Sequence, residues 1–156
     1  LNNRMAYWHL APGHANRLVP GKRVRHTMNA PMVFKDGKLW ATLGTPGADH
    51  QVQVNTQVLV AMADLGADPQ TALESPRWSS SQAGQGANWP HEGDGALTIE
   101  EDFGADILAD LAGRGHAIKK VPHLGAPCAV QAIRVLDNGI RQAGSDPRRD
   151  GWAGAY

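Results

Sequence analysis

Apolar residues come in short runs, broken by turn-forming residues, at two places in the chain. The first predicts a hairpin over residues 32–43, because Asp36 and Gly37 suit the positive φ angles of a type I′ turn. The second predicts a hairpin over residues 129–143, turning at 137–139 (DNG).

Between these hairpins the apolar spacing lengthens to that of a helix. A stripe with spacings of four, four and three predicts a helix over residues 52–65, ended by Gly66. The stripe consists of Val54, Val58, Met62 and Leu65, with Ala61 beside it. Asp68 and Pro69 predict the cap and first turn of a short helix through Leu73. A further helix is predicted around Phe103, Ile107, Leu108 and Leu111, closed by Gly113 or Gly115.

Two stretches show no such pattern. Residues 1–30 contain two Pro-Gly pairs and predict an ordered loop that needs support from another part of the protein. Residues 79–95 are rich in Ser, Gly, Gln and Asn and predict a long surface loop. The order of strands, helices and strands indicates an α/β domain in which helices cover a sheet.

Length and charge narrow the class of protein. The 156 residues suffice for one domain, and 15 basic residues balance 15 acidic ones. A nucleic-acid binder would show a basic excess, and the short basic run at 22–26 does not supply one, so we expect no nucleic-acid partner. No apolar run approaches the roughly 18 residues of a membrane helix. The chain does not begin with methionine; we expect a processed or partial product and leave the compartment open.

Few residues stand out as chemistry-bearing on type alone. Cys128 is the only cysteine, so no internal disulfide can form, and its small apolar neighbours favour a buried structural thiol over a reactive nucleophile. The seven histidines show no ligand spacing, so we expect no metal and no cofactor. Asp49 is expected to cap a helix or face solvent, with a substrate contact of the Asp49-His50 pair as the alternative. The alternating charges of 145–150 predict ion pairs that hold the C-terminus on the fold.

Four segments in order together resemble one family, the γ-glutamyltranspeptidases. They are residues 1–5 (LNNRM) with 20–23 (PGKR), 31–38 (PMVFKDGK), 44–47 (GTPG) with 74–77 (ESPR), and 144–151 (GSDPRRDG). The resemblance implies the N-terminal nucleophile hydrolase fold, a four-layer αββα sandwich. It places residues 1–156 in the C-terminal portion of the small subunit, within a single domain completed by a second chain or segment.

The family resemblance also implies a nucleophile that this chain does not carry. Members cut their own precursor, and the new N-terminal threonine of the small subunit attacks the substrate with its own α-amine as base. The resemblance implies that this threonine lies a few tens of residues before Leu1, and none of the six threonines here, all internal, can replace it. The implied partners are the large subunit of the same precursor and a small-molecule amide. A dimer of such heterodimers is left open.

Catalytic roles carry over to the turn at 44–48. The family's paired glycines offer backbone N–H groups as an oxyanion hole; Gly47 matches the first and Ala48 replaces the second. An alanine keeps the donor if its φ angle is accessible to alanine. The alternative is a tight strand-to-helix connection without chemistry.

Specificity residues depart from the family pattern. Ala6 and Tyr7 stand where γ-glutamyl enzymes have two aspartates, the second of which binds the substrate's α-ammonium, and a phenol carries no charge at neutral pH. His26 and Thr27 replace the serine pair that holds the α-carboxylate, while Arg4 or an adjacent arginine could pair with an anion. This pattern resembles the family's cephalosporin-acylase-like branch, which accepts acyl groups such as glutaryl that lack the amine. A second branch of the family, which hydrolyses small amides such as oxamate, is also left open. Packing in the subunit core is the alternative role for Tyr7.

The sequence thus predicts an amide-bond hydrolase or acyltransferase with specificity shifted away from γ-glutamyl groups. Gly47 and Ala48 are the predicted catalytic residues, and Arg4, Tyr7, His26 and Thr27 the predicted substrate-binding residues. Two alternatives stay open: a γ-glutamyltransferase or glutathione hydrolase with a rearranged ammonium site, and a catalytically dead paralogue with a binding or structural role.

Overall fold

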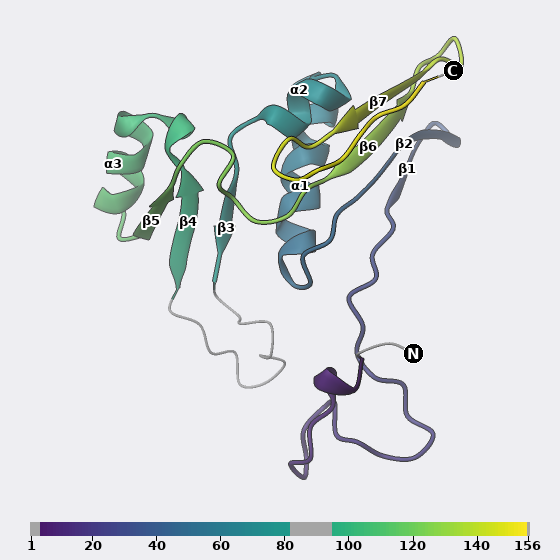
Figure 1. The fold of residues 1–156 in the computed structure, drawn as a ribbon, viewed down its shortest axis with the longest axis vertical. Helices are drawn as coiled ribbons and strands as arrows, with labels where there is room; N and C mark the ends of the chain where they lie inside the picture. The colour runs from purple at the N-terminus through teal and green to yellow at the C-terminus, as the bar shows by residue number, and fades with distance from the viewer. Residues whose placement is uncertain (1–3, 82–94, 156) are drawn as a thin grey trace.

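The computed structural model describes residues 4–81 and 95–155, which form two β-sheets and three α-helices (Figure 1). The elements are β1 (Met32–Lys35), β2 (Lys38–Gly44), α1 (His50–Ala63), α2 (Pro69–Glu74), β3 (Trp78–Ser80), β4 (Ala96–Glu100), α3 (Ala105–Gly113), β5 (Ala117–Val121), β6 (Gln131–Val135) and β7 (Arg141–Ser145). Short 3-10 turns cover Arg4–Tyr7 and Glu101–Phe103. Figure 1 shows α1 and α2 between the larger sheet and the smaller one.

The larger sheet, in the order β1-β2-β6-β7, contains both predicted hairpins. Asp36 and Gly37 have φ angles of 50° and 74°, both positive as a type I′ turn requires, and β1 pairs antiparallel with β2. The β6–β7 turn ends at Gly139, whose φ is 83°. Antiparallel pairing of β2 with β6 joins the hairpins, so segments some ninety residues apart lie side by side, with Gly44 opposite Gln131.

The main core lies where α1 and α2 cover one face of this sheet. Ala41 and Leu43 alternate along β2 toward the helices, as the period of two requires. From α1 come Val54, Val58, Ala61 and Met62, all buried as predicted. The predicted helix bounds were two residues late, and Leu65 is 78% exposed because α1 ends at Ala63 before its side chain can turn inward.

The short helix α2 forms as predicted. The Asp68 carboxylate accepts from the N–H groups of Gln70 and Thr71 and so satisfies two donors that a helix start leaves unpaired. Helix α2 packs directly on β7, since a side chain at Gly144 would lie 2.9 Å from the Gln70 nitrogen.

The sequence did not predict the smaller sheet. Its order is β3-β4-β5, with β4 and β5 parallel and α3 as the crossover between them. The predicted loop from Ser79 was wrong for Ser79 and Ser80, which pair in β3, and its stretch at 82–94 lies outside the described residues. The predicted helix is confirmed as α3 with Leu108 buried and Ile107 half exposed, but Phe103 lies outside it, in the preceding 3-10 turn.

Residues 4–31 form a predominantly irregular segment beyond the N-terminal end of α1 (Figure 1). Its contacts with the fold include bonds from the N–H of Leu43 to Pro31 O and from Gln51 Nε2 to Thr27 O. In the part of the chain that the structure describes, no helix is long and apolar enough to cross a bilayer.

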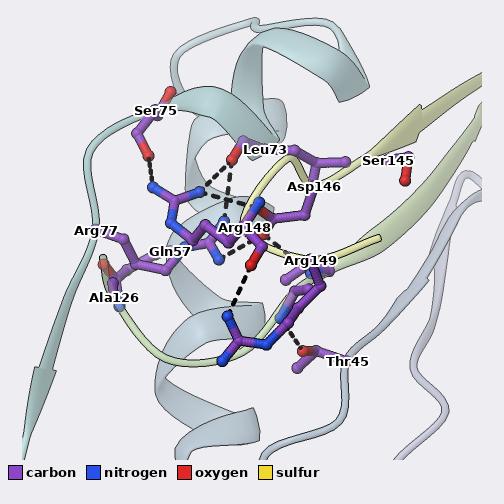
Figure 2. A network of polar contacts seen from close by, with 12 residues as sticks. Thr45, Gln57, Leu73, Ser75, Arg77, Ala126, Ser145, Asp146, Arg148 and Arg149 are labelled. Carbon is purple, nitrogen blue, oxygen red and sulfur yellow. Dashed lines mark hydrogen bonds and ion pairs between the residues drawn. The ribbon is translucent and has the colours of Figure 1, made fainter. Parts of the chain in front are cut away.

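The predicted ion pairs at the C-terminus are present, but they are buried and include two partners from the middle of the chain. Arg148 pairs with Glu100 at 2.6 Å. Asp146 pairs with both Arg148 and Arg77, the latter at 2.6 Å (Figure 2). We call Arg77, Glu100, Asp146 and Arg148 the ion cluster. All four are at most 6% exposed.

Candidate active site

The predicted oxyanion turn connects β2 to the first residue of α1. Gly47 and Ala48 have positive φ angles of 140° and 50°. Within the described residues neither N–H donates a hydrogen bond, while the carbonyls of both accept from the first turn of α1. The turn therefore presents two unpaired donors at the positive end of a 14-residue helix, an environment that favours negative charge.

The φ angle of Ala48 shows that alanine can occupy the position where the family pattern has its second glycine. At 50° the residue lies in the left-handed region, which alanine can adopt at a cost of roughly 1–2 kcal/mol. The backbone donor is therefore kept, at the expense of some local strain.

A recess of about 490 Å³ opens beside this turn. We call it the larger recess; its lining includes Arg4, Thr27, Gly47, Ala48 and Gln51. Arg4 Nη1 donates to Thr27 Oγ1 at 3.0 Å, so two predicted substrate-binding residues contact each other at its wall. Of the described residues in the lining, only Arg4 is charged, which favours an anion over an ammonium group in this recess.

A smaller recess of about 260 Å³ adjoins it and shares Thr27, Ala48 and Gln51. His26 is exposed and lines only this smaller recess, so it lies next to the oxyanion turn without facing the larger recess. The predicted capping role of Asp49 is wrong: its carboxylate caps no N–H of α1 and instead pairs with Arg25. The one carboxylate among the described residues that line the smaller recess is thus already paired with a positive charge.

Tyr7 lines neither of these recesses in the described part of the chain. Its ring packs against two guanidinium groups, with Arg4 Cζ at 5.7 Å and Arg25 Cζ at 5.8 Å from the ring centre, the range of cation–π contacts. Asn16 holds the same corner, donating to Tyr7 O and accepting from the N–H of Arg25. The geometry gives Tyr7 contact with Arg4 and Arg25, not a place in the wall of either recess.

Cys128 is buried, as predicted, and burial raises the pKa of its thiol. It lies directly behind Gly47: a β-carbon built on Gly47 would be 2.2 Å from Cys128 Sγ. His50 begins α1, and its Nδ1 is buried without a hydrogen-bond partner in the described structure. Among those residues no group of three or more His, Cys, Asp or Glu could hold a metal ion.

Sequence reasoning missed two residues that build the site. Gln51 is 7% exposed and ties the first turn of α1 to Thr27 O at 2.8 Å. Thr45 Oγ1 accepts from the N–H of Ala129 at 2.9 Å. A polar residue at an inward helical position could have indicated Gln51, but no local signal indicates a partner 84 residues away.

Comparisons with known proteins identify the family of the chain. The sequence model described as gamma-glutamyltranspeptidase matches residues 1–156. The chain belongs to this family.

Relatives within the gamma-glutamyltranspeptidase family differ in their named activities. A glutathione hydrolase-like YwrD proenzyme of Bacillus subtilis is 36% identical over 98% of this chain and 28% of its own length. An oxamate amidohydrolase proenzyme of Klebsiella pneumoniae is 30% identical over 99% of this chain and 28% of its own length. The solved cephalosporin acylase from Bacillus halodurans is 33% identical with a TM-score of 0.79, over 97% of this chain and 27% of that one. The chain thus spans about a quarter of the length of these relatives.

These matches confirm the resemblance seen in the sequence. They also confirm a mixed α/β fold with two sheets that matches solved gamma-glutamyltranspeptidase and acylase structures. The relatives are proenzymes, and they include both hydrolases and acylases.

Proposed function

We propose that this chain is the C-terminal portion of the small subunit of an amide-bond hydrolase or acyltransferase with specificity shifted away from γ-glutamyl groups. The nucleophile is an N-terminal threonine outside residues 1–156, which forms an acyl-enzyme with the substrate and releases the amine. Water or an acceptor amine then takes the acyl group.

One observation carries this proposal. Within the described structure, the larger recess combines two backbone donors that make no hydrogen bond, at Gly47 and Ala48, with the positive charge of Arg4. Two N–H groups beside a helix start can stabilise the oxygen on which negative charge develops during acyl transfer, and one such donor is worth about 3 kcal/mol. The guanidinium can bind a carboxylate at the far end of the acyl group.

The shift in specificity rests on the charges around both recesses. A γ-glutamyl group carries an ammonium, which requires a nearby carboxylate. Among the described residues, Asp49 is the only acidic one in the lining of either recess, and it is paired with Arg25. A glutaryl group has the same carboxylate without the ammonium, so it fits these charges better.

The fold proposed for the complete protein is the four-layer αββα sandwich, with a large subunit as partner. Helices α1 and α2 cover one face of the larger sheet, whereas Met32 and Ile133 on the other face are 64% and 39% exposed. An apolar sheet face needs a covering layer, and a second sheet would supply it.

The test compares γ-glutamyl-p-nitroanilide with glutaryl-p-nitroanilide on the matured full-length protein. We expect a higher kcat/KM for the glutaryl compound. A preference for the glutamyl compound would refute the specificity proposal and favour the glutathione hydrolase alternative. Release from neither would refute acylase activity on these groups. Because one relative is named an oxamate amidohydrolase, ammonia release from oxamate then separates a small-amide hydrolase from a dead paralogue.

A further inference from the structure

The segment 126–130 packs against the predicted oxyanion turn, residues 44–48. Thr45 Oγ1 accepts from the N–H of Ala129 at 2.9 Å, and its hydroxyl donates to Pro46 O at 2.7 Å. This one side chain therefore links the turn to a segment 84 residues further along the chain. Figure 2 shows Thr45 at the edge of the network formed by Asp146, Arg148 and their partners.

Cys128 makes the second contact with the turn. Its Sγ fills the space where a β-carbon of Gly47 would otherwise lie, at 2.2 Å from that position. Cys128 is 5% exposed and has a φ of 78°, a region that costs a non-glycine residue about 1–2 kcal/mol. Such strain persists where the surrounding structure determines the conformation, and it is often associated with functional sites.

The segment 126–130 is itself fixed at both ends by buried carboxylates. Glu100 Oε1 accepts from the N–H of Ala126 at 3.0 Å, and Asp146 Oδ2 accepts from the N–H of Val130 at 3.0 Å. Both carboxylates belong to the ion cluster and are 1% exposed. A continuous path of short contacts therefore runs from the ion cluster through 126–130 to Gly47.

We propose that Thr45 and Cys128 are positioning residues that hold the N–H groups of Gly47 and Ala48 in place for transition-state stabilisation. This inference rests on the proposed function, in which those two groups bind the developing oxyanion. The turn has few other restraints, because its two donors are unpaired in the described structure. Donors that drift by a fraction of an ångström lose much of their effect on the transition state, while ground-state binding changes little.

The first experiment compares Thr45→Val with Thr45→Ser in the matured full-length protein, using glutaryl-p-nitroanilide. Valine has the shape of threonine but lacks the hydroxyl, whereas serine keeps it. We expect Thr45→Val to lower kcat about 10- to 100-fold with KM changed less than about twofold, and Thr45→Ser to retain near wild-type kcat. Rates are normalised to the processed fraction, and a thermal melt shows whether both variants stay folded.

A second readout does not depend on activity. Wild-type and variant proteins are treated with iodoacetamide, and alkylation of Cys128 is followed by peptide mass spectrometry. Because the thiol is covered by the turn, we expect slow labelling in wild type, labelling at least about tenfold faster in Thr45→Val, and wild-type labelling in Thr45→Ser. The measurement needs neither processing nor turnover.

The outcomes separate the two proposals. If wild type cleaves neither anilide but Thr45→Val labels faster, the proposed acylase activity on these groups fails and the link from Thr45 to the turn stands. If Thr45→Val labels at the wild-type rate, or if serine loses as much kcat as valine, the role of Thr45 is overturned. Cys128→Ala tests the other contact: a several-fold loss of kcat at constant KM supports it, and an unchanged kcat refutes it.

Discussion

Replacing Asp146 by asparagine should show how strongly the ion cluster holds this fold together. Asp146 accepts from Arg77 Nη1 at 2.6 Å, from the N–H of Val130 at 3.0 Å, and from Arg148 through both its N–H at 3.0 Å and Nη1 at 3.1 Å. Asparagine has nearly the same shape, but it removes one negative charge and one acceptor oxygen. Two buried guanidinium groups would then share a single carboxylate, that of Glu100.

The expected loss follows from the burial of these charges. Breaking a buried ion pair by removing one partner costs about 3–5 kcal/mol, since the remaining charge stays uncompensated. In a unit of 150–250 residues that lowers Tm by about 6 to 20 °C, and by less if the unit is part of a larger cooperative protein. Asp150→Asn is the matched control: it makes the same chemical change four residues away at an exposed position, and should shift stability by less than about 0.5 kcal/mol.

The same variant should change the response to acid. Burial alone would raise the pKa of Asp146, but the N–H of Arg148 and the charge of Arg77 outweigh it and hold the pKa below its ordinary value of 3.8. A carboxyl whose folded pKa is depressed stabilises the protein above its unfolded pKa. That stabilisation is lost as the pH falls through the folded pKa. Wild type should therefore lose stability progressively below about pH 4.

The assay is a urea titration of the full-length protein and both variants at pH 7 and at steps from pH 4.5 down to 2.5. Asp146→Asn should have a lower midpoint at pH 7 and a shallower pH dependence below pH 4. Glu100, whose pKa is also lowered through the Arg148 hydrogen bond despite opposing burial, remains to provide part of the slope. An Asp146→Asn midpoint equal to that of Asp150→Asn would refute the assignment of the ion cluster as a major source of stability.

Two other substitutions test the helix cap and the substrate corner. Asp68→Ala removes the N-cap of α2 and should lower the free energy of unfolding by about 0.5–2 kcal/mol in a urea titration. Asp64→Ala, at an exposed position, is the control and should lower it by less than about 0.5 kcal/mol. Equal losses would contradict the capping role. Tyr7→Asp alone should not create a γ-glutamyl preference, because Arg4 and Arg25 would pair with the new carboxylate. Adding Arg4→Gln should then raise the glutamyl-to-glutaryl ratio of kcat/KM by about tenfold or more, and a single variant that already prefers glutamyl would contradict this reading.

The larger sheet and its helices could be predicted because their signals are local. Asp36 with Gly37 and the cap at Asp68 each act within a few residues, and the α1 stripe needs only its own period. The smaller sheet could not be predicted in this way. Ser79 and Ser80 look like loop residues, and only pairing with β4 makes them a strand.

The candidate site likewise has features that the sequence predicts and features that depend on distant contacts. A family pattern in the sequence was enough to predict that Gly47, Ala48, Arg4 and Thr27 would meet, and the structure brings them to one recess. It could not predict which charges remain available there, since that depends on pairings such as Arg25 with Asp49, 24 residues apart.

The position of Tyr7 shows why this distinction matters for specificity. From the sequence, a tyrosine in place of an aspartate reads as a simple loss of the ammonium's counter-ion. In the structure its ring lies against two guanidinium groups, and one of these, Arg4, donates to Thr27 at the recess wall. The substitution therefore does two things at once: it removes a negative charge and supports a positive one. Changing Tyr7 back to aspartate would restore only the negative charge, so the preference that we propose, for an acyl group without an ammonium, would depend on the Arg4–Tyr7–Arg25 arrangement as a whole.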